Sequence, residues 1–304
     1  MTVAGRHTRP EAGADAQARP PVIDAHQHFW RVARGDYGWL TPGLAPLHRD
    51  FMPADLAPIL ARHGVTRTIL VQAAPTVAET DFLLAIADAT PWVAGVVGWV
   101  DFTARDAVAT IARLAAHPRF VGVRPMVQDI ADDDWLLDPA FAPVFRALAG
   151  HRLVFDALVL PRHLPRLARI VERHPQLAVV IDHAAKPPIR DGARGLDPWR
   201  RDLGALAGAP NVMCKLSGLV TEAASDWTPE VLSPYIEHVL DVFTPRAIVW
   251  GSDWPVVELG GGYDRWRAAT FALLAGVAAD DRAAILGGNA SRIYLARDAA
   301  AATH

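Results

Sequence analysis

From residue 22 onward, this chain of 304 residues alternates short apolar segments with longer amphipathic ones, eight times over. Continuous apolar runs between amphipathic helices are typical of parallel strands that helices cover on the outside. Strands are predicted over 22–28, 68–72, 93–101, 120–124, 153–158, 178–183, 211–216 and 247–253. Helices are predicted over 53–63, 79–90, 103–117, 139–149, 161–174, 199–207, 229–243, 263–276 and 280–294. Eight such units predict an α/β fold, a (β/α)8 TIM barrel, in preference to an open doubly wound sheet.

A single domain accounts for most of the chain. We expect a disordered tail over 1–20, one barrel domain over 21–296 and a second tail over 297–304. The first tail carries arginines among Ala, Gly and Pro and has no apolar core of a signal peptide. With 51% hydrophobic and 21% charged residues, the chain can bury one large core.

Charge and cysteine content exclude several classes of partner and site. The net charge is -3 and no basic cluster is long enough to follow phosphates, so we expect no nucleic-acid partner. No apolar run approaches the roughly 18 residues that span a bilayer, so we expect no membrane span. The single cysteine, Cys214, excludes an internal disulfide and suits a reducing cytoplasm. No surface pattern indicates the oligomeric state, and a homo-oligomer stays open.

Polar residues end nearly every predicted strand. In a barrel of this kind the side chains at the carboxyl ends of the strands face the active-site mouth. These residues are His26, His28, Gln72, Asp101, Arg124, Asp156, His183, Lys215 and Asp253. Because unpaired charges inside a barrel are costly, their repetition favours a polar pocket.

Three histidines stand out among these residues. His26 and His28 lie on the same side of one strand because side chains alternate along it. His183 ends another strand, whereas His151, His163 and His238 fall on helices or turns and are expected to face solvent.

The three strand-end histidines and Asp253 form a ligand set that suits one zinc or manganese ion. Asp253 could also take the proton of an attacking water.

The remaining candidates are cationic or aromatic. Arg124 and Lys215 could hold a substrate or a developing oxyanion, and Lys186 lies just past its strand. The alternatives are an internal salt bridge from Arg124 to Asp101 or Asp156 and a solvated Lys186. Four aromatic residues are expected to flank the mouth: Trp30, Tyr37, Trp39 and Trp254. They could pack the loops on the barrel rim or stack on a sugar ring, and Trp254 is expected nearest to the substrate.

Six motifs together resemble the amidohydrolase superfamily, and within it the branch of sugar lactonases that act on L-fucono- and L-rhamnonolactone. They are DAHQHFW (24–30), VQ (71–72), GVR (122–124), IDHAAKP (181–187), CKLSGL (214–219) and GSDWP (251–255), in the order of the family. The resemblance runs from about residue 22 to 294. It implies a distorted barrel that hydrolyses the ester of a lactone by attack of water.

The resemblance also assigns roles. His26, His28, His183 and Asp253 match the metal-site residues of the family, Asp253 matches its general base, and Arg124 matches a substrate-contacting arginine. With His183 as the second catalytic candidate, the predicted substrate-binding set is Gln72, Arg124, Asp156, Lys186, Lys215, Trp30 and Trp254.

One departure concerns the metal. Two-metal members bridge their ions with a carboxylated lysine or a glutamate on a middle strand, where this chain offers Arg124 and Asp156. The expectation is therefore one divalent metal or a metal-independent site.

Three other functions stay open beside the hydrolysis of a sugar lactone to its acid. The same residues could hydrolyse an unsaturated dicarboxylate lactone, or support metal-dependent non-oxidative decarboxylation. A non-enzymatic sugar-binding barrel would not need Asp253 together with all three histidines, which counts against it.

Overall fold

The computed structural model describes residues 21–192 and 196–296, so the two predicted tails lie outside the described residues. Its centre is one sheet of eight parallel strands whose order follows the chain. The strands are β1 (Ile23–Gln27), β2 (Arg67–Val71), β3 (Val93–Gly98), β4 (Phe120–Val123), β5 (Val154–Ala157), β6 (Val179–Ile181), β7 (Val212–Leu216) and β8 (Ile248–Trp250). The predicted eight-stranded barrel is confirmed.

The segment that follows β8 closes the seam against β1. The backbone N–H of His28 donates to the carbonyl of Trp254 at 2.7 Å, and the N–H of Asp253 donates to the carbonyl of His26 at 2.8 Å. These bonds bring residues more than 220 positions apart into adjacent places. The first and last strands therefore present their polar ends side by side.

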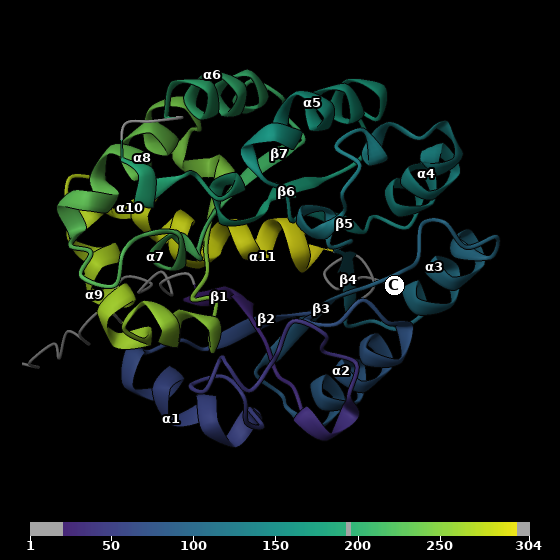
Figure 1. The fold of residues 1–304 in the computed structure, drawn as a ribbon, viewed down its shortest axis with the longest axis horizontal. Helices are drawn as coiled ribbons and strands as arrows, with labels where there is room; N and C mark the ends of the chain where they lie inside the picture. Colours follow the sequence, from purple (N-terminus) through teal and green to yellow (C-terminus); the bar gives the residue numbers. More distant parts are fainter. Residues whose placement is uncertain (1–20, 193–195, 297–304) are drawn as a thin grey trace, which may run out of the picture.

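Helices surround the sheet, as Figure 1 shows. They are α1 (Pro53–His63), α2 (Val77–Ala89), α3 (Ala107–Ala115), α4 (Ala142–Gly150), α5 (Leu164–Arg173), α6 (Leu196–Ala207), α7 (Leu219–Glu222), α8 (Pro229–Val242), α9 (Tyr263–Leu273), α10 (Ala279–Ala283) and α11 (Asn289–Tyr294). Within 21–192 and 196–296, no helix is long and apolar enough to cross a membrane.

Helix α1 illustrates how local sequence sets these elements. Pro53 occupies its first turn, where a missing N–H costs nothing, and the Asp55 carboxylate accepts the N–H of Met52 at 2.9 Å. The helix ends at Gly64, which adopts the left-handed φ of 63°. Both ends agree with the prediction.

Helix α11 closes the amino-terminal end of the barrel and crosses the centre of the view in Figure 1. The side chain of Asn289 donates to the carbonyls of Pro245 and Ile248, each at 2.7 Å, which ties α11 to the start of β8. Ala290 and Tyr294 pack on inward-facing strand residues. Because this end is filled, the carboxyl ends of the strands form the accessible mouth.

Three local predictions differ from the structure. The helix predicted over 280–294 is divided by a π-helical turn, Ala284–Gly288, in which Gly287 packs so closely on the backbone of Pro21 that no side chain fits. Strand β3 ends at Gly98, and Asp101 instead accepts the N–H of Thr103 at 2.9 Å in the following turn. His163 is fully buried instead of solvent-facing, and its ring accepts the N–H of Leu160 at 3.1 Å.

Candidate active site

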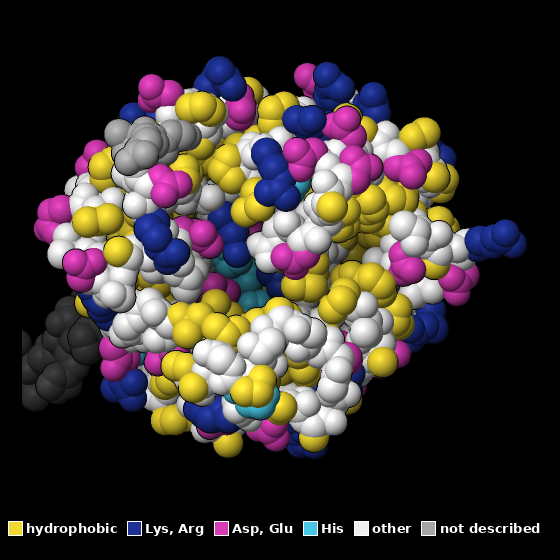
Figure 2. Space-filling view, in the orientation of Figure 1, with side chains coloured by type: hydrophobic (Ala, Val, Ile, Leu, Met, Phe, Trp, Pro, Cys, Tyr) yellow, Lys and Arg dark blue, Asp and Glu magenta, His cyan; other side chains and the backbone are white. Residues whose placement is uncertain are grey.

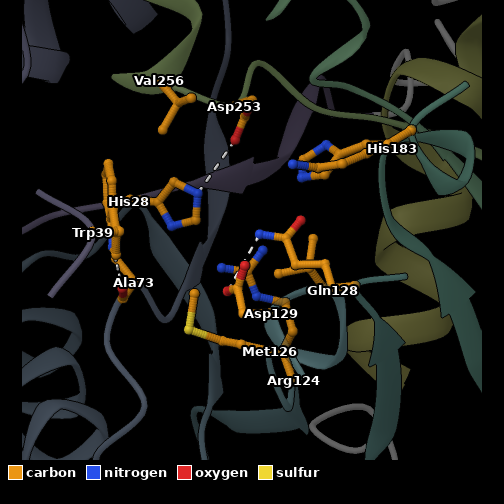
Figure 3. A pocket seen from close by; sticks show the side chains of 12 residues that line it. His28, Trp39, Ala73, Arg124, Met126, Gln128, Asp129, His183, Asp253 and Val256 are labelled. Atoms are coloured by element: carbon orange, nitrogen blue, oxygen red, sulfur yellow. Dashed lines mark hydrogen bonds and ion pairs between the residues drawn. The ribbon is translucent and has the colours of Figure 1, made fainter. Parts of the chain in front are cut away.

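A cavity of about 230 Å³ opens at the carboxyl ends of the strands. In Figure 2 it is the hollow in the middle of the face, with histidine and acidic side chains at its floor. Six residues that the sequence placed at the mouth line it: His28, Trp39, Arg124, His183, Lys186 and Asp253. Figure 3 shows His28, His183 and Asp253 directed toward the same space.

Three atoms converge at the floor of this cavity. His26 Nε2 lies 3.2 Å from His28 Nε2, and Asp253 Oδ1 lies 3.6 Å from the first and 3.3 Å from the second. His28 Nδ1 is 2.8 Å from the carbonyl of Val71, which can only accept, so Nδ1 carries hydrogen and a neutral ring leaves the lone pair on Nε2. His26 Nε2 lies 3.3 Å from Arg124 Nη1, and His26 Nδ1 lies 3.5 Å from Asp182 Oδ1, so the tautomer with hydrogen on Nδ1 makes Nε2 an acceptor too. Three acceptors this close require a proton or a cation between them.

The spacing of these atoms fits a divalent metal ion. A tetrahedral zinc ion with bonds of about 2.0–2.1 Å separates its ligand atoms by about 3.4 Å, close to the three distances here. The bond from His28 to the Val71 carbonyl is the kind of outer contact that orients a metal-binding imidazole. The ligand atoms of His26, His28 and Asp253 form one group within 4.8 Å, whereas His183 groups with His26 and Asp182.

The charge state of the site follows from its burial. Burial lowers the pKa of His26 well below its ordinary value, although Asp182 acts in the opposite direction. Burial likewise lowers the pKa of His183 to about 4, against the opposing carboxylates Asp253 and Asp182. Burial alone would raise the pKa of Asp253, but His183 and the hydrogen bond to His28 hold it below its ordinary range. At neutral pH the floor therefore presents neutral His26 and His183 rings and an ionised Asp253.

His183 is held by an unusual backbone. It has φ 54°, and the left-handed conformation continues through Lys186, which turns the chain sharply out of β6. Its Nδ1 lies 2.8 Å from the hydroxyl of Ser217. The next residue, Gly218, has φ 62°, and a Cβ there would meet the His183 ring at 2.7 Å or closer. Gly218 is thus required both by its conformation and by the close approach of the ring.

Lys215 and Asp156, predicted to bind substrate, lie beneath the cavity with no exposed surface. The Lys215 ammonium contacts Asp156 at 2.7 Å and Asp182 at 2.8 Å, and Tyr294 donates to Asp156 at 2.8 Å. Burial alone would lower the pKa of Lys215, but the two carboxylates outweigh it and raise the pKa above its ordinary value. The ammonium also lies 3.3 Å from His26 Nδ1, so this buried network supports the site from below.

Arg124 is partly committed to internal contacts. Its guanidinium lies 3.4 Å from Asp182 and also donates to the backbone carbonyl of Gln72. The Gln72 amide in turn donates to the Arg124 carbonyl at 2.7 Å and is fully buried. The internal partner of Arg124 is therefore Asp182, in place of Asp101 or Asp156, and Gln72 orients the arginine from behind the cavity.

Of the aromatic residues expected at the mouth, Trp39 reaches the cavity, whereas Trp30 and Trp254 do not line it. Trp39 lines the cavity and donates its indole N–H to the carbonyl of Ala73 at 2.7 Å. Trp30 packs edge-on against Trp39 at 5.4 Å, and Trp254 packs against Phe51 at 5.2 Å. Both are buried outside the described lining of the cavity, because the long loop after β1 folds over them.

Glu79 on α2 supports the wall of the cavity. Its carboxylate has no exposed surface and accepts the backbone N–H groups of Ala73 at 3.0 Å and Ala74 at 2.8 Å. Ala73 lines the cavity and anchors Trp39. Burial raises the pKa of Glu79 to about 7, although these hydrogen bonds act in the opposite direction.

A pH-dependent stability follows from Glu79. The folded protein holds this proton more tightly than the unfolded chain, so the contribution is present below about pH 4.5 and is lost as the pH rises through 7. We expect Glu79→Gln to remove a dependence on the order of 3 kcal/mol. Urea unfolding at pH 5 and pH 8 measures it: the stability of the wild type relative to Glu79→Gln should be larger at pH 5. An equal difference at both pH values would contradict the assignment.

Several residues of the site were not predicted, among them the polar residues Asp182, Gln128 and Asp129. Asp182 lies between Lys215, Arg124 and His26, and its place directly before His183 was the available signal. Gln128 and Asp129 line the cavity from a 3-10 turn, Val127–Asp129, after β4. No periodic pattern marks a residue of an irregular loop, so the sequence carried no signal for these two.

Known proteins resemble this chain over most of its length. A family model described as Amidohydrolase matches residues 23–295. The L-fucono-1,5-lactonase of Burkholderia ambifaria is 49% identical over 278 residues, which cover 90% of this chain and 94% of the relative. The L-fucono-1,5-lactonase of Burkholderia multivorans is 37% identical over 290 residues, which cover 90% and 95%.

Solved structures agree with this relationship. The crystal structure of an amidohydrolase from Burkholderia multivorans with bound zinc superposes with a TM-score of 0.85 at 35% identity, covering 90% of this chain and 99% of that one. The family match over residues 23–295 includes all eight strands and the residues that line the cavity. The predicted resemblance is thereby confirmed, and the chain belongs to the amidohydrolase family.

Proposed function

We propose that this protein hydrolyses a sugar lactone, with L-fucono-1,5-lactone as the first substrate to test, to the open-chain sugar acid. The observation that carries the proposal is the convergence of His26, His28 and Asp253 at the floor of the cavity. The two relatives named as L-fucono-1,5-lactonases, 49% and 37% identical, support the substrate class.

The proposed reaction begins with Asp253 as the general base. Its carboxylate takes a proton from water as the water oxygen bonds to the lactone carbonyl carbon. Arg124 and His183, which line the same cavity, face the negative charge that develops on the carbonyl oxygen. The ring carbon–oxygen bond then breaks, and the proton held by Asp253 passes to the leaving ring oxygen, which yields the hydroxy acid.

His26, His28 and Asp253 would hold one divalent metal ion, and zinc suits this set of nitrogen and carboxylate ligands. When bound, such an ion polarises a carbonyl oxygen as a Lewis acid. Neutral imidazoles are the forms that bind metal, and the lowered pKa of His26 keeps its ring available across neutral pH.

Acid release from L-fucono-1,5-lactone, followed with a pH indicator, tests both parts of the proposal. We expect rapid hydrolysis, a fall of at least about tenfold after dialysis against a chelator, and recovery with zinc. The rates measured alongside for L-rhamnono- and L-galactonolactone would show which sugar stereochemistry the enzyme prefers.

Two results would count against the proposal. Full activity in protein that elemental analysis finds free of metal would contradict the metal site. A shared proton would then have to hold the three acceptor atoms together. Failure to hydrolyse any of the sugar lactones would contradict the proposed reaction.

A further inference from the structure

We infer that Gln128 and Asp129 recognise the ring hydroxyls of a neutral lactone and select against lactones that carry a carboxylate. The inference rests on the proposed function and narrows its substrate class. It starts from the turn Val127–Asp129, which forms one wall of the cavity opposite Asp253 and His28 in Figure 3.

Gln128 is a partly exposed residue of the cavity lining whose side-chain amide oxygen lacks a partner among the described residues. Its backbone N–H donates to the carbonyl of Leu158 at 3.0 Å, and its carbonyl accepts from Arg162 at 3.4 Å, so neighbouring chain holds both sides of the residue. Its side-chain Oε1 is buried and has no hydrogen-bond partner among the described residues. A buried amide oxygen without a partner is costly unless a ligand supplies a donor, and a sugar hydroxyl is such a donor.

Asp129 is exposed to solvent and brings a carboxylate without a cationic partner among the described residues to the rim of the same wall. Within 21–192 and 196–296, no Lys, Arg or His nitrogen lies within 4.0 Å of its carboxylate. Its contact is with Gln128 Nε2, at 3.5 Å. Ring hydroxyls can donate to this carboxylate, whereas a second carboxylate on the substrate would be repelled.

The cations of the cavity are already matched by acids. Arg124 pairs with Asp182 at 3.4 Å, and Lys186 pairs with Glu222 at 3.5 Å. A substrate carboxylate would have to compete with these partners. The cavity therefore suits a neutral, hydroxylated ring better than a dicarboxylate lactone.

Three lactones with six-membered rings test the inference on the full chain. L-fucono-1,5-lactone is neutral and hydroxylated, δ-valerolactone has the same ring without hydroxyls, and the 1,5-lactone of an aldaric acid adds a carboxylate. We expect Gln128→Met to lower kcat/KM about tenfold more for L-fucono-1,5-lactone than for δ-valerolactone. We expect Asp129→Asn to raise kcat/KM for the aldaric lactone about fivefold relative to L-fucono-1,5-lactone.

Asp132→Asn is the matched control, because it makes the same charge change on the same loop at a residue outside the described cavity lining. In this control, the kcat/KM ratio of L-fucono-1,5-lactone to δ-valerolactone and its ratio to the aldaric lactone should both stay within about twofold of the wild-type values. Equal losses on the hydroxylated and unsubstituted lactones in Gln128→Met would overturn the hydroxyl contact. An unchanged ratio in Asp129→Asn, or the same change in Asp132→Asn, would overturn the charge selection.

Failure of the hydrolytic function is distinguishable from failure of this inference. If the wild type hydrolyses none of the three lactones, calorimetric binding of L-fucose and L-galacturonate, which share their ring stereochemistry, makes the same comparison without a reaction. A preference for the neutral sugar that Asp129→Asn weakens supports the inference. Equal binding of the two sugars by the wild type contradicts it.

Discussion

Asp253→Asn should lower kcat for the hydrolysis of L-fucono-1,5-lactone by at least about a hundredfold while the fold is retained. The amide cannot accept the proton of the attacking water, and it is a weaker metal ligand than the carboxylate. The backbone should tolerate the change, because Asp253 has φ 61° and Asn adopts this left-handed region readily. The bond from its N–H to the His26 carbonyl, at 2.8 Å, does not involve the side chain.

Circular dichroism and zinc content accompany the rate measurement. A variant that retains zinc and the native spectrum but loses activity places the loss in proton transfer, whereas parallel loss of zinc places it in metal binding. Asp264→Asn is the control, since Asp264 is exposed and pairs with Arg62 and His63 on the surface. Activity of Asp253→Asn within about fivefold of the wild type would remove Asp253 as the base.

Lys215→Met should lower the free energy of unfolding by about 3–5 kcal/mol, because it leaves the buried Asp156 without a cation and Asp182 with Arg124 alone. The ammonium lies 2.7 Å from Asp156 and 2.8 Å from Asp182, and none of the three side chains is exposed. Methionine fills a similar volume but supplies no charge. Urea unfolding at pH 7 measures the loss.

Two further variants separate the charge from the packing. Lys186→Met makes the same substitution at a partly exposed pair with Glu222 and should cost less than about 1 kcal/mol. Lys215→Met combined with Asp156→Asn should recover part of the loss, because one of the two buried charges is gone. A loss below about 1 kcal/mol in Lys215→Met alone would mean that the buried network contributes little to stability.

Lys215 also shows why a strand-end position does not by itself identify a substrate contact. Alternation along a strand places a side chain inside the barrel, but how deep it lies depends on the stagger between strands. Lys215 and Asp156 lie below the cavity, whereas His28 and Asp253 line it. The difference arises because Lys215 and Asp156 lie within β7 and β5, whereas His28 and Asp253 follow the last residues of β1 and β8.

The aromatic residues show that position in a loop does not by itself identify a substrate contact either. Trp30 and Trp254 flank the two motifs with the clearest catalytic signal, yet they are buried against Trp39 and Phe51. Trp39, from the long loop after β1, lines the cavity instead. Proximity along the chain to a catalytic residue does not decide which ring faces the substrate, because the path of the loop does.

The sequence by itself was sufficient to predict the eight-stranded barrel and the gathering of His28, Arg124, His183 and Asp253 at its mouth. Both follow from short-range rules: apolar periodicity specifies the strands, and parallel strands in a barrel end on one face. The tertiary structure alone decided that Asp182 pairs with Lys215 and Arg124, and that Gln128 and Asp129 form a wall of the cavity. Those contacts join segments distant in sequence through strand stagger and loop packing, which no local pattern encodes.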